Sequence, residues 1–350
     1  MGSSETSVAK DAAKPAADPV PPALRQAWRE AHMVPLWESP TAHKLDLVRE
    51  RAFHWPWRVT RPILEQTAAI SSPAVVERRV LSLVNPKSKS AEDEATTGTI
   101  SACLQTLMPG DRARPHRHSM NALRFALEGE GARTVVDGKD CPMHVGDLVI
   151  TPAWCWHEHT HGGAGPFIWL DVLDVQLHLF LGTDEFEPGP AARMPAVTDD
   201  SVFTWAGIAP CIAPPERAVS PIFRYPWADA VRALAAAPVG PDRTRRVRYT
   251  NPLDGGACMT TLDCYLTQLE AAVPTRAFRT SASAVFAVAE GSGTSRIGDV
   301  RVDWKPKDVF TVPQGVWATH TADAGGARLF MVSNRDVMRR LELLREAYAE

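Results

Sequence analysis

Two stretches of the chain alternate apolar and polar residues in short segments, a pattern typical of β-strands. The first begins at Thr99 and continues to about residue 174, and the second runs from about Thr260 to Asn334. Turn-forming residues interrupt the first stretch, at Gly129, Asp137-Gly138 and Gly146-Asp147. Each stretch therefore predicts an all-β sandwich or small barrel. An apolar run at residues 75–84 predicts one further strand just before the first stretch.

Helical patterning surrounds these strands. It predicts helices at Leu24–His32, Thr41–Arg51, Arg61–Ile70, Trp227–Ala237 and Arg335–Ala349. Residues 1–23 are rich in Ala, Pro and Ser, which predicts a disordered tail. The predicted order is a tail (1–23), a helical arm (24–75), a first barrel (76–184), a linker with a helix (185–250), a second barrel (251–334) and a C-terminal helix (335–350).

The two β stretches are similar to each other. NALRFALEGEGA at 121–132 lines up with SASAVFAVAEGSGT from 281, and VGDLVITPAWCWHEH at 145–159 lines up with PKDVFTVPQGVWATH at 306–320. The offset is 162 residues between Gly131 and Gly293 and 161 between Pro152 and Pro313. A repeat of this length predicts two copies of one barrel.

Composition narrows the class of protein. The 350 residues carry a net charge of −3 with both signs mixed, so nucleic acid is not an expected partner. No apolar run is long enough to span a membrane, and the N-terminus has no signal-peptide pattern. The six cysteines include no CxxC pair, which predicts mostly buried free thiols in a cytoplasmic protein.

Three histidines in the first stretch are the strongest chemical feature. His116 and His118 are two residues apart in a strand-like segment, so both imidazoles point to one face. His157 lies in a second such segment, from which it can complete a metal site. Three neutral imidazoles suit Fe(II), and also Zn, Cu and Ni. A site with no further protein ligand keeps open positions, as a catalytic metal requires.

The second copy of the repeat is an internal control. It has Phe278, Thr280 and Ala318 at the positions of the three histidines, and it keeps only His320, opposite His159. The joint loss of three imidazoles is expected if they serve one metal. We therefore expect the second barrel to be metal-free and structural.

The spacing also resembles the two motifs of the cupin family. Gly110, five residues and His116-Arg-His118 match the first motif, and Gly146, five residues, Pro152 and His157 match the second. The glutamate of most metal cupins is absent, because Ala122 and Leu123 occupy its place. The bound cation should then keep its full charge and favour an anionic bidentate ligand. The implied fold is a bicupin, with two double-stranded β-helix (jelly-roll) barrels.

Longer stretches resemble one branch of that family, the gentisate and salicylate 1,2-dioxygenases with their nitrosalicylate and hydroxynaphthoate relatives. They are MVPLWE at 33–38, ERRVLSLVNP at 77–86, HRHSMNALRFALEGEGA at 116–132 and the run from GDLVITPAWCWHEH to Asp174. The resemblance implies one Fe(II) per chain on His116, His118 and His157. It also implies cleavage by O₂ of a small aromatic acid, between the carboxyl- and hydroxyl-bearing carbons, in a homotetramer.

Further residues are predicted around the metal. Arg124 shares the strand parity of His118, so it should face the same cavity and bind a carboxylate. His159 shares the parity of His157, and the resemblance implies an acid/base role for it near the substrate hydroxyl. Asp171 is an acidic residue in an apolar strand and could orient Arg124 or a histidine. His161 is expected to be exposed.

Four residues are predicted to contact the substrate. Either Arg78 or Arg79 should reach the cavity, and Gln105 could hydrogen-bond a ring substituent. Cys103 stands where gentisate-cleaving members of the family have glycine. Its larger side chain argues for a 5-substituted salicylate such as 5-nitrosalicylate, with gentisate or salicylate next.

Two other functions stay open. A cupin isomerase or hydrolase would use the same metal site without O₂. A binding or regulatory cupin would show no turnover and would need a recognition domain, and no basic helix-turn-helix pattern is present.

Overall fold

The computed structural model describes residues 20–38, 50–76, 78–88, 94–189, 199–203 and 219–350. The chain divides into two units, Met1–Val48 and Arg49–Glu350. The predicted helix Thr41–Arg51 lies almost entirely outside the described residues, as does most of the predicted tail 1–23. None of the described helices is long and apolar enough to cross a membrane.

The first unit contains one helix and one short turn. Helix α1 spans Pro22–Glu30, close to the predicted range, and the 3-10 turn η1 spans Leu36–Glu38. Arg25 and Glu38 form an ion pair of 2.7 Å, and the rings of Trp28 and Trp37 meet edge to face. These contacts hold the turn against the helix.

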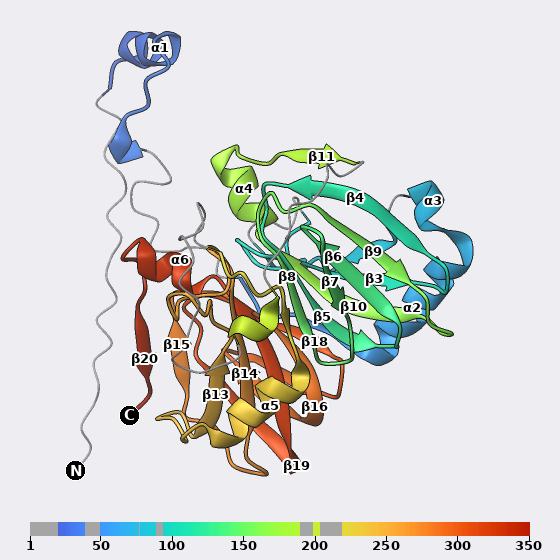
Figure 1. The fold of residues 1–350 in the computed structure, drawn as a ribbon. Helices are drawn as coiled ribbons and strands as arrows, with labels where there is room; N and C mark the ends of the chain where they lie inside the picture. Colours follow the sequence, from blue (N-terminus) through green and yellow to red (C-terminus); the bar gives the residue numbers. More distant parts are fainter. Residues whose placement is uncertain (1–19, 39–49, 77, 89–93, 190–198, 204–218) are drawn as a thin grey trace, which may run out of the picture. The chain divides into compact units, whose positions relative to one another are not determined.

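The N-terminal barrel consists of two antiparallel sheets (Figure 1). Its strands are β2 Val80–Ser82, β3 Ser101–Leu107, β4 Arg112–His118, β5 Ala122–Glu128, β6 Ala132–Val136, β7 Lys139–Pro142, β8 Leu148–Thr151, β9 His157–His161, β10 Phe167–Leu173, β11 Phe186–Pro188 and β12 Arg224–Tyr225. One sheet has the order β12-β8-β5-β10-β3-β2, and the other has β11-β4-β9-β6-β7. Asp137 and Gly138, both at positive φ, make the predicted two-residue turn between β6 and β7.

The C-terminal barrel has a similar strand arrangement, but some of its strands are longer and uninterrupted. Its strands are β1 His54–Trp55, β13 Thr244–Arg248, β14 Asp263–Leu269, β15 Phe278–Thr280, β16 Ala284–Ile297, β17 Val300–Trp304, β18 Val309–Val312, β19 Ala318–Ser333 and β20 Glu346–Tyr348. The main order is β1-β18-β16-β19-β14-β13, with β15 beside β19 and β17 beside β16. The long strand β16 corresponds in position to β5 and β6 together, and β19 corresponds to β9 and β10.

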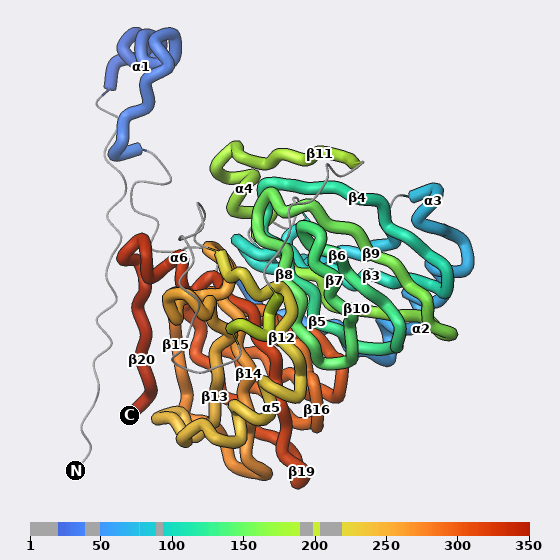
Figure 2. Tube along the Cα trace, viewed as in Figure 1, coloured from blue at the N-terminus to red at the C-terminus, as the bar shows by residue number. Residues whose placement is uncertain are grey.

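Each barrel borrows an edge strand from the other half of the chain. Strand β1 precedes the N-terminal barrel but pairs with β18 of the C-terminal one, and β12 precedes the C-terminal barrel but pairs with β8 of the N-terminal one. Figure 2 shows β12 where the two barrels meet. A helix follows each borrowed strand: α2 spans Trp57–Ile70 and α5 spans Trp227–Ala236. The repeat therefore extends to a strand–Pro–Trp–helix segment on each side.

One buried carboxylate anchors each borrowed segment. Asp308 accepts hydrogen bonds from the backbone N–H of Trp57 at 2.6 Å and from His54 Nε2 at 2.8 Å. Asp147, the equivalent residue, accepts from the backbone N–H of Trp227 at 2.8 Å and from Arg224 Nε at 2.9 Å. Each carboxylate thus caps a helix start that no side chain of the helix itself caps.

The two barrels share a hydrophobic core. Phe125 of β5 and Phe330 of β19 stack with ring centroids 4.1 Å apart and planes 3° apart. Leu123, Leu266 and Val332 belong to the same buried cluster. Burial of this apolar surface on both sides makes the barrels one structural unit.

The prediction and the structure differ in three places before the C-terminal segment. The predicted strand 75–84 is a short helix, α3 Pro73–Val76, followed by β2 at Val80–Ser82. The predicted linker contributes β11, β12 and β13 to the barrels, and helix α4 at Val175–Leu181 was not predicted. The three strands of the predicted linker form because each pairs with a strand that is distant in the sequence.

The predicted C-terminal helix is wrong in its second half. Helix α6 covers only Arg335–Arg340, and Glu342 then takes a positive φ of 59° that reverses the chain. Strand β20 follows and pairs with β15, so its backbone hydrogen-bonding groups are satisfied by the barrel edge. The local helical pattern is overridden by this pairing.

Candidate metal centre

The three predicted metal ligands meet inside the N-terminal barrel. His116 and His118 come from β4 and His157 from β9, and His116 lies directly opposite His157 in the antiparallel pairing. One nitrogen of each ring lies within 4.8 Å of the others, and all three residues are buried. The pleat of β4 explains the arrangement, because it turns His116 and His118 to the same face.

Hydrogen bonds fix which nitrogen each ring presents. Each Nδ1 donates to a backbone carbonyl: that of Arg114 for His116 at 3.0 Å, of Met120 for His118 at 2.9 Å and of Cys155 for His157 at 3.0 Å. Each Nε2 is then the unprotonated nitrogen. Nε2 of His116 and of His157 is buried with no hydrogen-bond partner among the described residues. Buried orphan acceptors that converge in this way fit a cation.

The surroundings keep these imidazoles neutral. Burial, aided by the charge of Arg78, lowers the pKa of His116 to about 3. Burial and the charge of Arg124 lower the pKa of His118 to about 4 and bring the pKa of His157 well below its ordinary value. Neutral imidazole is the form that coordinates metal, so the site is ready for a divalent ion.

The facing sheet presents a buried cation toward the same interior. Arg124 of β5 is 2% exposed, and its Nη1 donates to Thr151 Oγ1 of β8 at 2.5 Å. Asp171 of β10 lies opposite Arg124 in the strand pairing, with its Oδ1 3.9 Å from Arg124 Nε. Neither atom has a hydrogen-bond partner among the described residues. Burial lowers the pKa of Arg124 and raises that of Asp171, although each charge opposes the other's shift.

Gln105 and Cys103 lie on the same face of this sheet. Cys103 is paired with Asp171 and Gln105 with Trp169, so alternate residues of β3 and β10 share one side. Gln105 Nε2 is buried and has no hydrogen-bond partner in the described part of the chain. Burial, with a smaller contribution from Asp171, raises the pKa of the Cys103 thiol to about 12. The thiol is therefore a neutral group at physiological pH.

His159 lies next to the metal ligands on β9. Its ring centroid is 5.8 Å from that of His157, and its Nδ1 is 2.8 Å from the Thr134 hydroxyl oxygen. Burial lowers its pKa well below the ordinary value. Strand parity placed it correctly, but the prediction that His161 is exposed is wrong. His161 is buried and hydrogen-bonded to the Gly165 carbonyl at 2.5 Å.

Several known proteins are similar to this chain in sequence and in fold. Residues 103–173 match the cupin domain family. A gentisate 1,2-dioxygenase of Aquipseudomonas alcaligenes is 36% identical over 301 residues, 84% of this chain and 86% of that protein. A 5-aminosalicylate 1,2-dioxygenase of a Comamonas species is 35% identical over 341 residues, 93% of this chain and 90% of that protein. A crystal structure of the salicylate 1,2-dioxygenase from Pseudaminobacter salicylatoxidans superimposes with a TM-score of 0.86 at 30% identity, covering 96% of this chain and 99% of the other.

The chain belongs to the gentisate and salicylate 1,2-dioxygenase family. It is a ring-cleaving dioxygenase with the bicupin fold, as the sequence predicted. In this dioxygenase, the N-terminal barrel holds the three-histidine cluster that could bind the metal.

The structure separates the roles of Arg78 and Arg79. Arg79 is 4% exposed and bonded to Asp111 at 2.8 Å, to the Thr106 carbonyl at 3.3 Å and to Ser71 through both Nε and Nη2. Its donors are used in bracing β3 and α2, which argues against the predicted substrate contact. The Arg78 guanidinium lies 5.2 Å from the ring centroid of Phe186, and its charge lowers the pKa of His116. Arg78 is therefore the one of the two whose charge acts on the histidine cluster.

Three residues near the site were not predicted. Thr134 orients His159, and Thr151 holds Arg124. Phe186 of β11 pairs with His118 and stacks on His116 at 5.5 Å, although its segment was assigned to the linker. Parity along 132–136 and 148–151 could have indicated the two threonines, since both strands were predicted. Nothing in the sequence near Phe186 indicated that it returns to β4.

Proposed function

We propose that this dioxygenase binds one Fe(II) through His116, His118 and His157 and uses O₂ to open the ring of a 2-hydroxybenzoate. Cleavage occurs between the carboxyl- and hydroxyl-bearing carbons. Fe(II), when bound, supplies the one-electron chemistry with O₂ that amino-acid side chains lack.

One observation carries this proposal. Three neutral imidazoles on one sheet face a buried guanidinium on the other, and Arg124 Nε has no hydrogen-bond partner among the described residues. A buried unpaired donor is costly, and a substrate carboxylate would satisfy it. A metal on one wall and a carboxylate-binding group on the other suit a small aromatic acid with an ortho hydroxyl.

The protein's own groups position this substrate. Arg124 donates hydrogen bonds to the carboxylate, and Asp171 and Thr151 hold its guanidinium in place. Arg78 adds a second positive charge near the same face. His159, oriented by Thr134, holds or transfers a proton at Nε2 beside the substrate hydroxyl.

The substrate class follows from Cys103 and Gln105. The neutral thiol of Cys103 occupies space that glycine would leave open, and Gln105 Nε2 offers a free amide donor. Both favour a 2-hydroxybenzoate with a polar group at carbon 5, such as 5-nitrosalicylate, before gentisate or salicylate. The 5-aminosalicylate 1,2-dioxygenase aligned over 93% of this chain also supports a 5-substituted ring. The 5-nitrosalicylic acid 1,2-dioxygenase of a Bradyrhizobium species aligns over 37% of it.

The test is a panel of 2-hydroxybenzoates with the iron-reconstituted enzyme. We expect one mole of O₂ to be consumed for each mole of ring opened, as measured by the absorbance of the product. The activity should be highest with a 5-substituted salicylate. Turnover under strict anaerobiosis would instead indicate a non-oxidative metal cupin. Absence of turnover with full iron loading would indicate a binding cupin.

Two further properties belong to this proposal. We infer a homotetramer, to be measured by light scattering coupled to size exclusion, where a monomer would contradict the inference. The five described cysteines are all free thiols, which supports a cytoplasmic location. Fractionation of the native cells would test that location.

A further inference from the structure

The C-terminal barrel contains a cavity of about 280 Å³. Its wall is formed by β13, β14, β15, β16, β18, β19 and β20, so it lies inside the barrel between the two faces. An apolar cavity of about 150 Å³ is large enough for benzene. The C-terminal cavity therefore has room for an aromatic ring with substituents.

This cavity corresponds to the metal centre of the other barrel. The strand pairing of Phe278 with Ala318 repeats that of His116 with His157, and Thr280 repeats His118. All three replacements line the cavity. The metal-binding wall has thus become a wall without metal ligands while its shape is kept.

The opposite wall of the cavity also has apolar residues in place of the polar residues of the N-terminal barrel. Phe286 pairs with Met331 in the C-terminal barrel, as Arg124 pairs with Asp171 in the N-terminal one. Both replacements line the cavity. The buried ion pair is replaced by an aromatic ring and a thioether, groups that favour contact with a ring.

One polar group at the centre has been retained. His320 stands where β9 has His159, and its Nδ1 is 2.7 Å from the hydroxyl of Ser295, the equivalent of Thr134. The Ser295 oxygen also accepts a hydrogen bond from Trp304 Nε1 at 2.9 Å, which leaves the Ser295 proton available to His320 Nδ1. His320 lines the cavity, and its Nδ1 contact with Ser295 leaves Nε2 as the nitrogen available to a ligand. Burial lowers its pKa to about 4, so the ring is neutral.

The charged groups at the cavity are largely paired with each other. Arg246 binds Asp242 at 2.7 Å, and Arg335 makes two hydrogen bonds to Glu346 at 2.8 and 2.6 Å. Arg276, which is exposed, donates to the Ala349 carbonyl at 2.6 Å. The lining therefore offers little unsatisfied positive charge to an anion, which favours a neutral ligand.

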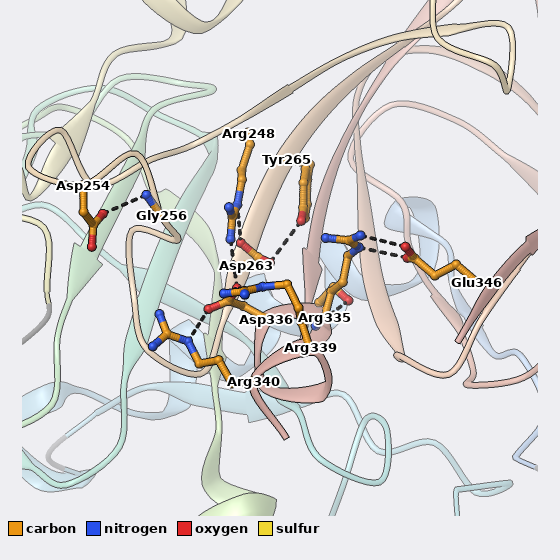
Figure 3. A network of polar contacts seen from close by, with 11 residues as sticks. Arg248, Asp254, Gly256, Asp263, Tyr265, Arg335, Asp336, Arg339, Arg340 and Glu346 are labelled. Atoms are coloured by element: carbon orange, nitrogen blue, oxygen red, sulfur yellow. Dashed lines mark hydrogen bonds and ion pairs between the residues drawn. The ribbon is translucent and has the colours of Figure 1, made fainter. Parts of the chain in front are cut away.

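The C-terminal segment closes one side of this cavity. Figure 3 shows Asp336 of α6 between Arg248, Arg339 and Arg340, and Arg335 reaching across to Glu346 of β20. Tyr348 of β20 packs on Phe278 with ring centroids 4.9 Å apart. The buried Asp336 carboxylate thus anchors the segment that carries Glu346 and Tyr348 to the cavity.

We propose that the C-terminal barrel binds a neutral single-ring phenol, with the ring among Phe278, Phe286 and Met331 and the oxygen on His320 Nε2–H. This site is separate from the metal centre and does not depend on ring cleavage. The second barrel then has a ligand-binding role in addition to its structural one.

The test uses 4-bromophenol with the iron-loaded full-length enzyme. In crystals we expect a bromine anomalous peak inside the C-terminal barrel, and in solution a dissociation constant below 1 mM by calorimetry, as roughly expected for such a small ligand. 4-Bromobenzoate, the anionic counterpart, should bind this barrel at least about tenfold more weakly. The affinity for 4-bromophenol should be the same in His118→Ala, because that variant alters only the metal centre.

Two variants and one control separate this site from non-specific binding. Ala318→Phe fills the cavity and should weaken binding at least about tenfold, whereas Ala324→Phe on the exposed part of the same strand should not change it. His320→Leu should weaken binding about two- to tenfold through the lost hydrogen bond. If Ala318→Phe fails to fold, His320→Leu and the bromine peak decide. No peak in the barrel, a peak without binding in solution, or equal affinity in Ala318→Phe and Ala324→Phe would overturn the proposal.

Discussion

The N-terminal and C-terminal barrels have equivalent strands, but different residue types occupy the inward positions of those strands. His157 lies opposite His116 in one barrel, and Ala318 lies opposite Phe278 in the other. Arg124 faces Asp171 in one, and Phe286 faces Met331 in the other. The fold is therefore compatible with either a three-histidine cluster facing a buried guanidinium or a mainly apolar cavity, because the strand pairing does not depend on these inward side chains.

The borrowed segments, in contrast, are held by the same kind of contact in both barrels. Asp147 and Asp308 bind equivalent backbone and side-chain groups in both barrels. These residues hold a strand and a helix that come from the other half of the chain. The parts shared by both barrels are thus the ones that build the fold, and the parts that differ are the ones that determine what each barrel binds.

The largest expected effect comes from removing one imidazole. His118→Ala should lower kcat/KM more than about 100-fold and abolish stoichiometric iron binding, because two ligands cannot hold the ion in place. The melting temperature without metal should stay close to that of the wild type, since the C-terminal barrel has Thr280 at this position. Activity, iron content and thermal unfolding are measured together.

Arg117→Ala is the matched control for that variant. Arg117 lies between the two histidines on β4, but its side chain points outward and pairs with Glu187 at 2.6 Å. Iron content and kcat/KM should be unchanged. Retained activity in His118→Ala, or equal losses in both variants, would contradict the assignment of the metal ligands.

A second prediction converts part of one barrel into the other. Arg124→Phe alone leaves Asp171 buried without its partner and should lower the free energy of unfolding by up to about 3–5 kcal/mol. Adding Asp171→Met reproduces the pair found in the C-terminal barrel and should recover most of that loss. Ring cleavage should be lost in both variants, because the carboxylate-binding guanidinium is gone.

Urea unfolding of the single and double variants tests this conversion. If the two pairs are interchangeable in the fold, the double variant should be more stable than Arg124→Phe. If the double variant were less stable, the ion pair would be part of the fold and not only of the site. Substantial ring cleavage without Arg124 would contradict its role in binding the carboxylate.

The third prediction concerns the shared anchors. Asp147→Ala and Asp308→Ala each leave a part-buried helix-start N–H without an acceptor, so each should lower the free energy of unfolding by about 1–3 kcal/mol. Similar losses are expected because the contacts are equivalent. A loss confined to one variant, measured by urea unfolding, would show that the two exchanged segments do not stabilise the barrels equally.

The smallest expected effect is a change of substrate preference. Cys103→Gly enlarges the N-terminal pocket where Tyr265 stands in the C-terminal barrel. We expect the ratio of kcat/KM for gentisate to that for 5-nitrosalicylate to rise by about three- to tenfold, with iron content unchanged. Cys264→Gly, which removes a buried thiol on β14 of the C-terminal barrel, is the control for a general loss of packing. A ratio unchanged in Cys103→Gly would remove this residue from the determinants of specificity.

Much of the site could be predicted because strand periodicity is local. The two-residue alternation placed His116, His118 and Arg124 on inward faces without knowledge of the partners of those strands. The alignment of the two repeat copies then predicted that the barrel interiors differ, because the second copy lacks the three histidines. These inferences needed only the order of residues along single strands.

The choice between Arg78 and Arg79 needed the structure. Both follow the short helix α3 and precede β2, where no periodicity assigns a face. Asp111, 32 residues away along the chain, binds Arg79, whereas Arg78 lies beside Phe186, which stacks on His116. Such a contact depends on the position of a distant loop, which local pattern does not encode.

The sequence by itself therefore determined the β class, the repeat and the three-histidine cluster, since each depends on periodicity or spacing within a short segment. Tertiary structure alone decided the exchange of β1 and β12 between barrels, the strand at Glu346–Tyr348 and the return of Phe186 to the metal centre. In each of these cases the backbone finds its hydrogen-bond partners in a strand far away in the chain. The free energy of that pairing outweighs the local preference of the residues themselves.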